Sequence, residues 1–170
     1  MQFRFSLLGL LTLLVACTAH VPTEKRFEDW EMYTNETYGF SVKHPPETTV
    51  QEEEGYIRLQ NYTDYDDVLG LQPGQYYLEI HLPKDPAQEG FATCEDDFAQ
   101  RASEPVAVKE VSVGDYTGYR GPGEEGGDAG GTRHALCIET PDRYFYVQAT
   151  ENSDAGLIAN AILDSFSITE

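Results

Sequence analysis

Two consecutive segments near the C-terminus, 132–139 (TRHALCIE) and 143–150 (RYFYVQAT), most constrain the fold of this chain. Both alternate with the period of a β-strand, yet both carry apolar or aromatic residues on each face. In the first, Leu136 lies on one face and Cys137 on the other. Strands of this kind must be covered on both sides. The Pro-Asp pair between them predicts a hairpin, which places both strands inside a sheet.

Two amphipathic segments can supply the cover. The first, 91–102, has apolar residues at helical spacing: Phe91, Cys94, Phe98 and Ala102. The second follows Ser153, a capping residue, and has the apolar stripe Ile158, Ala161 and Ile162. We therefore predict two helices on opposite faces of one largely antiparallel sheet, which is an α/β fold of the α-β-α layered sandwich type.

The other predicted strands lie earlier in the chain. Apolar and polar residues alternate in 40–43, 56–62 and 75–82, and 106–121 reads as two strands joined at Gly114-Asp115. The acidic stretch 51–55 (QEEEG) is interpreted as a loop.

Length and charge narrow the classes of function. The 170 residues leave room for one domain with a sizeable core. The formal net charge is −19, with 30 acidic against 11 basic residues. Such a surface repels phosphate, so we predict no nucleic-acid partner and no basic patch for anionic lipids.

The N-terminus predicts export. Arg4 precedes an apolar stretch of about a dozen residues, which is shorter than the roughly 20 that span a membrane. Residues 14–17 (LVAC) then resemble a bacterial lipobox, which implies diacylglycerol on Cys17, cleavage before it, and either a free amine or a further acyl chain on the new N-terminus. Ordinary signal-peptide cleavage before His20 is the competing interpretation.

The lipobox interpretation sets the domain organisation. Residues 1–16 are the signal peptide, 17–29 the lipidated N-terminus and tether, and 30–170 the folded domain. The lipid on Cys17 would place the domain outside the cytoplasm, at a cell membrane or an outer membrane.

With Cys17 lipidated, two cysteines remain. Cys94 belongs to the apolar stripe of the first predicted helix, and Cys137 to a predicted strand. Export places both in an oxidising compartment, so we predict a disulfide that joins the helix to the sheet. Two separate buried thiols are the alternative.

Several short strings resemble the PsbP-like fold of small bacterial lipoproteins. They are 38–42 (YGFSV) running into Pro45, 77–80 (YLEI), 144–147 (YFYV) and 161–168 (AILDSFSI). The resemblance spans about residues 30 to 169, although Glu47-Thr48-Thr49 stands where family members commonly have a Trp. It implies the layered fold and an accessory or binding role, and it offers no catalytic residues.

We find no catalytic signature and expect no cofactor. The sequence has no GxSxG, no HExxH and no phosphate-binding loop. His44 is expected to be exposed, and His134 to be partly buried beside Leu136. His81 shares a strand face with Tyr77 and Glu79, and that face either binds a ligand or is polar or covered by a helix.

Oxygen-rich loops suggest a cation site. Asp64, Asp66 and Asp67 are candidate calcium ligands, although their spacing does not match an EF-hand, and we expect no metal there. The leading hypothesis is a non-catalytic binding or accessory module whose partner is another envelope protein. The alternative is a cation- or small-ligand-binding protein that uses the acidic loops 62–67 and 121–131.

Overall fold

The computed structural model describes residues 28–63, 70–84, 93–101, 107–123, 131–141, 143–152 and 156–169. The predictions on Cys17, on the three aspartates Asp64, Asp66 and Asp67, and on Ser153 concern residues outside these ranges. The strands are β1 (Glu31–Asn35), β2 (Phe40–His44), β3 (Thr49–Glu53), β4 (Tyr56–Gln60), β5 (Tyr76–Lys84), β6 (Lys109–Val113), β7 (Tyr116–Pro122), β8 (Thr132–Glu139), β9 (Tyr144–Glu151) and β10 (Ser167–Ile168). The helices are α2 (Cys94–Arg101) and α3 (Gly156–Asp164), and within the described ranges no helix is long and apolar enough to cross a membrane.

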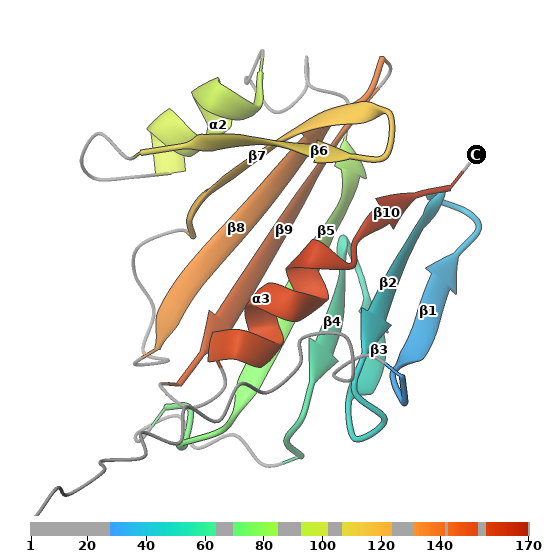
Figure 1. Cartoon of the computed structure of the whole chain (residues 1–170), viewed down its shortest axis with the longest axis vertical. Helices are drawn as coiled ribbons and strands as arrows, with labels where there is room; N and C mark the ends of the chain where they lie inside the picture. Colours follow the sequence, from blue (N-terminus) through green and yellow to red (C-terminus); the bar gives the residue numbers. More distant parts are fainter. Residues whose placement is uncertain are drawn as a thin grey trace, which may run out of the picture.

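A seven-stranded antiparallel sheet forms the centre of the fold, in the order β3-β4-β5-β9-β8-β7-β6 (Figure 1). The alternation of β8 places Leu136 and Ile138 in the larger core beneath α3, whereas Ala135 and Cys137 pack with α2 on the other face. The predicted α/β layered fold, with one helix on each face of a largely antiparallel sheet, is therefore confirmed.

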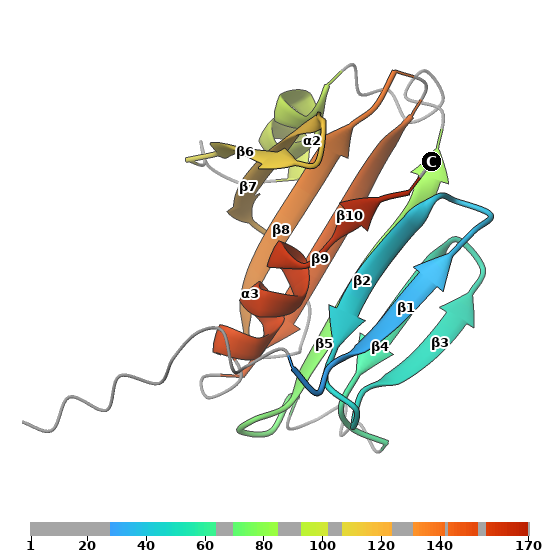
Figure 2. The same cartoon turned by 45° about the vertical axis from the view of Figure 1, so that its right-hand side comes forward.

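The strand Phe40–His44 lies outside the main sheet. It pairs with β1 and β10 in a separate three-stranded sheet, which lies beside β3 and β4 (Figure 2). Phe40 and Val42 of β2 are fully buried in the larger core. The prediction of a single sheet was incomplete, because alternation shows that one face of a strand is buried but not which strands it pairs with.

The acidic stretch predicted as a loop is largely a strand. β3 pairs with β4 across a turn in which Gly55 has φ +93°, and it forms one edge of the large sheet. Glu52 and Glu53 are exposed there, and the hydroxyl of Tyr33 donates to Glu52 Oε1 at 2.8 Å. A charged edge strand shows little apolar alternation, which is why the sequence pattern suggested a loop.

The second helix buries a slightly different stripe from the predicted one. Ala159, Ile162 and Leu163 are buried, whereas Ile158 and Ala161 are half-buried at the border of the stripe. Most positions of this helix are apolar, so a spacing of three and four residues fits more than one stripe. Contacts with β9, β8, β5 and β2 select the observed one.

The two predicted hairpins are present. Val113 pairs with Tyr116 across Gly114-Asp115, and β8 pairs with β9 along its whole length. Gly114 has φ +59°, a conformation that favours glycine at the first position of a two-residue hairpin turn.

Tyr76 should make the stability of the fold sensitive to high pH. It is fully buried, and its hydroxyl is 2.6 Å from Thr48 Oγ1. Burial raises the pKa of Tyr76 to about 12; the hydrogen bond with Thr48 opposes this rise, and the charge of Glu47 adds to it. Because this folded pKa exceeds the unfolded value of about 10, the contribution of Tyr76 is complete below pH ~10 and is lost as the pH rises through the folded pKa.

We therefore expect the urea midpoint of the wild type to fall more steeply between pH ~10 and ~12 than that of Tyr76→Phe. Equal slopes for the wild type and Tyr76→Phe would contradict the assignment.

Candidate functional site

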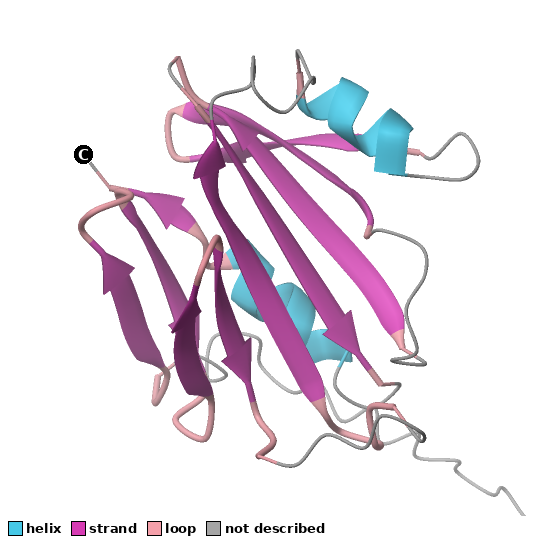
Figure 3. Cartoon of the chain, turned by 180° about the vertical axis from the view of Figure 1, so that it is seen from behind, coloured by secondary structure: helices cyan, strands magenta, loops and turns pink. Residues whose placement is uncertain are grey.

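The candidate site is the face of β4 and β5 that points away from α3, which we call the open face. Its side chains are Tyr56, Arg58, Gln60, Tyr77, Glu79 and His81. Among the described elements, α2 lies over β7 and β8 on this side of the sheet, and none lies over β4 and β5 (Figure 3). Tyr56, Tyr77 and His81 are half-buried, so their rings remain accessible in part.

Arg58 is at the centre of the open face. Its guanidinium carbon lies 5.3 Å from the ring centroid of Tyr56 and 5.4 Å from that of Tyr77, and Nη2 donates to Glu79 Oε1 at 2.5 Å. Burial on its own would lower the pKa of Arg58, but the hydrogen bond with Glu79 and the charges of Glu79, Tyr56 and Tyr62 raise it overall. A charged guanidinium is thus held in place between two tyrosine rings.

An aromatic row connects the open face to α2. Tyr56, His81 and Tyr146 occupy paired positions on β4, β5 and β9. The ring centroids of His81 and Tyr146 are 5.6 Å apart, and Phe98 of α2 packs 6.0 Å from Tyr146 on the other side. The guanidinium of Arg101 lies 4.3 Å from the centre of the Tyr146 ring, so both ends of the row carry a stacked arginine.

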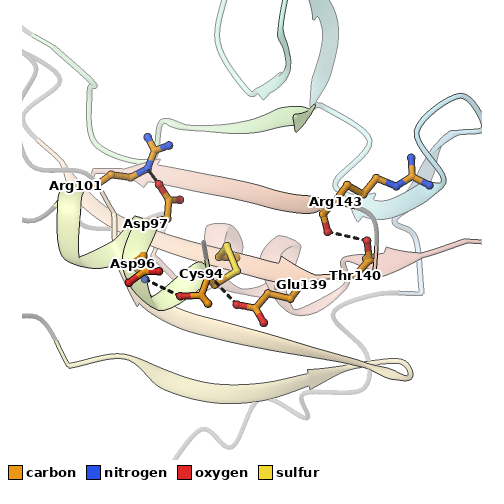
Figure 4. The surroundings of a disulfide bond; sticks show 9 residues. Cys94, Asp96, Asp97, Arg101, Glu139, Thr140 and Arg143 are labelled. Atoms are coloured by element: carbon orange, nitrogen blue, oxygen red, sulfur yellow. Dashed lines mark hydrogen bonds and ion pairs between the residues drawn. A yellow bond between two sulfur atoms is a disulfide. The ribbon is translucent and has the colours of Figure 1, made fainter. Parts of the chain in front are cut away.

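A disulfide holds α2 on the sheet, as the cysteine count predicted (Figure 4). Cys94 is bonded to Cys137 of β8, with a Cα–Cα distance of 5.7 Å. The backbone N–H of Cys94 donates to Glu139 Oε1 at 2.7 Å, and a carboxylate is favourable at a helix N-terminus. The close approach of α2 also requires Gly121, because a Cβ there would lie 2.8 Å from the ring of Phe98.

A polar pocket opens where the open face ends, at the start of β3 and β5 and just after β4. Its volume is about 320 Å³, and it is lined by Glu47, Thr49, Asn61, Tyr62, Thr63 and Gln75. The side-chain amide of Gln60, on the open face, donates to the backbone carbonyl of Tyr62 at 2.9 Å. This hydrogen bond fixes the backbone of Tyr62 at the edge of the pocket.

The three histidines of the folded domain have different surroundings. His44 is only 4% exposed, so the expectation of an exposed side chain was wrong. It continues the inward face of β2, and its Nδ1 is 3.0 Å from the carbonyl oxygen of Pro45. His134 is partly buried, as expected, and its Nε2 lies 3.1 Å from Oε1 of the buried Glu151.

Three tyrosines close to one another in the sequence have different surroundings. Tyr77 lies on the open face and Tyr62 lines the polar pocket, whereas Tyr76 belongs to the core. Tyr65, like Asp64, Asp66 and Asp67, lies outside the described ranges. In the part of the chain that the structure describes, no three His, Cys, Asp or Glu side chains gather closely enough to hold a metal ion.

Sequence reasoning located half of the open face. It placed Tyr77, Glu79 and His81 of β5 together, and the structure confirms that they share one strand face. It missed Arg58. The alternation in 56–60 (YIRLQ) already places Tyr56, Arg58 and Gln60 on one strand face and the buried Ile57 and Leu59 on the other. The pairing of Arg58 with Glu79 depends on the register of β4 against β5, which the alternation does not contain.

Comparison with known proteins shows a likeness of fold. The sequence matches no protein-family model and no curated protein. A Bacteroides thetaiotaomicron protein of known crystal structure superposes with a TM-score of 0.51 at 13% identity, over 84% of this chain and 49% of that one, so this chain spans about half its length. The solution structure of cyanobacterial PsbP (CyanoP) from Synechocystis sp. PCC 6803 aligns with a TM-score of 0.49 at 9% identity, over 82% of this chain and 92% of that one.

Proposed function

We propose that this chain is a lipid-anchored protein of the bacterial cell envelope whose acidic domain binds a partner protein and performs no catalysis. The open face carries the proposal. It combines two partly exposed tyrosines with an arginine that is already held in place by Glu79. Tyrosine and arginine are enriched among the residues that contribute most to protein–protein binding.

The side chains of the open face are held in fixed positions, which favours binding over catalysis. The Arg58 guanidinium is stacked and ion-paired before any partner arrives, so less side-chain entropy is lost on association. The chain carries a net charge of −19, which favours a partner with a basic surface and speeds its encounter.

Site-specific photo-crosslinking in the native host tests the binding face. A photo-crosslinking amino acid at Tyr77 should give a discrete adduct of higher mass, and Arg58→Gln in the same chain should reduce its yield by about tenfold, as expected for an interface hot spot. In isolated envelopes, the yield should also fall as salt is raised, because the attraction is electrostatic.

Met32 provides the matched control position. It is the most exposed large apolar side chain of the described residues, at 56%, and it lies on β1, which is not part of the large sheet. A photo-crosslinker there should not give the adduct. Equal adducts from both positions, or none from Tyr77, would contradict a partner at the open face.

The anchor rests on the lipobox resemblance of residues 14–17. Replacing Cys17 with Ala removes the thiol that would carry diacylglycerol, so the variant should move from the membrane fraction to the soluble fraction or remain as uncleaved precursor with its signal peptide. Mass spectrometry of the wild-type mature protein should find acyl chains on residue 17. A mature Cys17→Ala protein that stays in membranes as the wild type does would overturn the anchor.

A further inference from the structure

The described residues of the polar pocket present neutral hydrogen-bonding groups and one aromatic ring. Thr49 and Thr63 contribute hydroxyl groups and are exposed, and Tyr62 contributes a half-buried ring. Glu47 adds one exposed carboxylate. Among the described residues that line the pocket, none is aliphatic.

Hydrogen bonds within the protein hold the walls in place. The Asn61 side chain accepts from the backbone N–H of Tyr76 and donates to the carbonyl oxygen of Gly74, both at 2.9 Å. Gln75 Oε1 accepts from the backbone N–H of Gln72 at 2.7 Å, which leaves the NH₂ group of Gln75 as a donor for a ligand. The pocket is therefore formed before a ligand binds.

These groups exclude most classes of ligand. A phosphate or carboxylate ligand would be repelled by the carboxylate of Glu47 and by the negative potential of a chain with net charge −19. A hard divalent cation takes six to eight oxygens, commonly from several carboxylates, and the described residues that line this pocket include one carboxylate. An apolar ligand would leave the hydroxyl and amide groups without partners, at a cost of about 1–3 kcal/mol each when buried.

We infer that the polar pocket binds a neutral saccharide. Sugar hydroxyls both donate and accept, as do the hydroxyls of Thr49 and Thr63, and the Tyr62 ring offers a flat, rigid surface against a sugar ring. The pocket volume lies at the small end of the range for ligand sites, about 300–1,000 Å³, and suits one or two sugar rings. This inference is independent of the proposed function, because Arg58, Tyr77 and Glu79 do not line the pocket.

Nuclear magnetic resonance of the full chain tests it. Glucose, N-acetylglucosamine and the N-acetylglucosamine trimer are titrated while the side-chain amides of Asn61 and Gln75 are observed. At least one sugar should shift these signals saturably. Thr49→Val should weaken the binding of that sugar by about fivefold or more, because the hydroxyl is lost. Tyr62→Ala should weaken sugar binding further. Tyr62→Leu keeps an apolar side chain at this position and serves as the second variant if the alanine variant does not fold.

Thr34→Val is the matched control, because Thr34 is an exposed threonine on another edge strand, β1. It should bind the sugar as the wild type does. If none of the three sugars shifts the amides, or if Thr49→Val and Tyr62→Leu both bind as the wild type does, the inference is wrong. If calcium chloride or sodium phosphate shifts the amides and the sugars do not, the pocket is an ion site instead.

Discussion

Replacing Cys94 and Cys137 with alanine is expected to lower the free energy of unfolding by about 4 kcal/mol. The two residues are 43 positions apart, and the bond restricts the unfolded chain by closing the loop between them. For a domain of this size, such a loss corresponds to a fall of roughly 8–16 °C in Tm. Calorimetry in a Cys17→Ser background, with only the two paired cysteines present, gives the comparison.

Chemical reduction distinguishes the contribution of the disulfide bond to stability from the effect of replacing the two side chains. The Cys17→Ser protein should lose a similar free energy in dithiothreitol once the buried bond has been reduced, whereas the double alanine variant should not respond to the reductant. Hydrogen exchange should quicken in α2 before it quickens in β5 and β9, since α2 packs on the sheet through the small cluster of Phe98, Ala135 and Tyr146. An unchanged Tm in the double variant would show that the bond contributes nothing to stability.

Replacing Phe40 with alanine is expected to cost about 3–5 kcal/mol. The side chain is fully buried where the three-stranded sheet meets the large one. Its ring is stacked on that of Phe166, with centroids 5.3 Å apart, and it meets the Phe145 ring edge-on at 6.0 Å. Removing the ring opens a cavity between three aromatic neighbours, including Tyr33 on β1.

Urea denaturation gives this free energy directly. Met32→Ala, on the neighbouring strand but exposed, should change stability by less than about 0.5 kcal/mol. Phe40→Leu, which keeps most of the apolar volume, should lie between the two. If the small sheet were an independent unit, Phe40→Ala would give a separate early transition, and the large sheet would unfold at its wild-type midpoint.

The layering was predictable because β8 and β9 carry apolar residues on both faces. Leu136 and Cys137 point in opposite directions, so the sheet requires cover on each side, and the chain has amphipathic segments to supply it. The disulfide followed from the same pattern, with one cysteine on the strand and the other on a helix stripe.

The small sheet and the centre of the open face could not be predicted in this way. Both depend on which strand pairs with which, and at what register. The hydrogen bond between Arg58 and Glu79 exists because these residues are direct neighbours on β4 and β5. His44 is buried because it continues the inward face of β2, whose Phe40 and Val42 pack in the larger core, and nothing in its local sequence records that packing.

The edge strand β3 has a consequence for self-association. Among the described elements, no strand pairs with its outer edge, and another copy of the chain could add a strand there. Glu52 and Glu53 are exposed on this strand, and Glu54 follows in the turn. An antiparallel pairing of two such edges would bring carboxylates of both copies face to face, and like charges opposite each other destabilise a strand pair. This side of the molecule therefore terminates the sheet and resists growth into a continuous ribbon of copies.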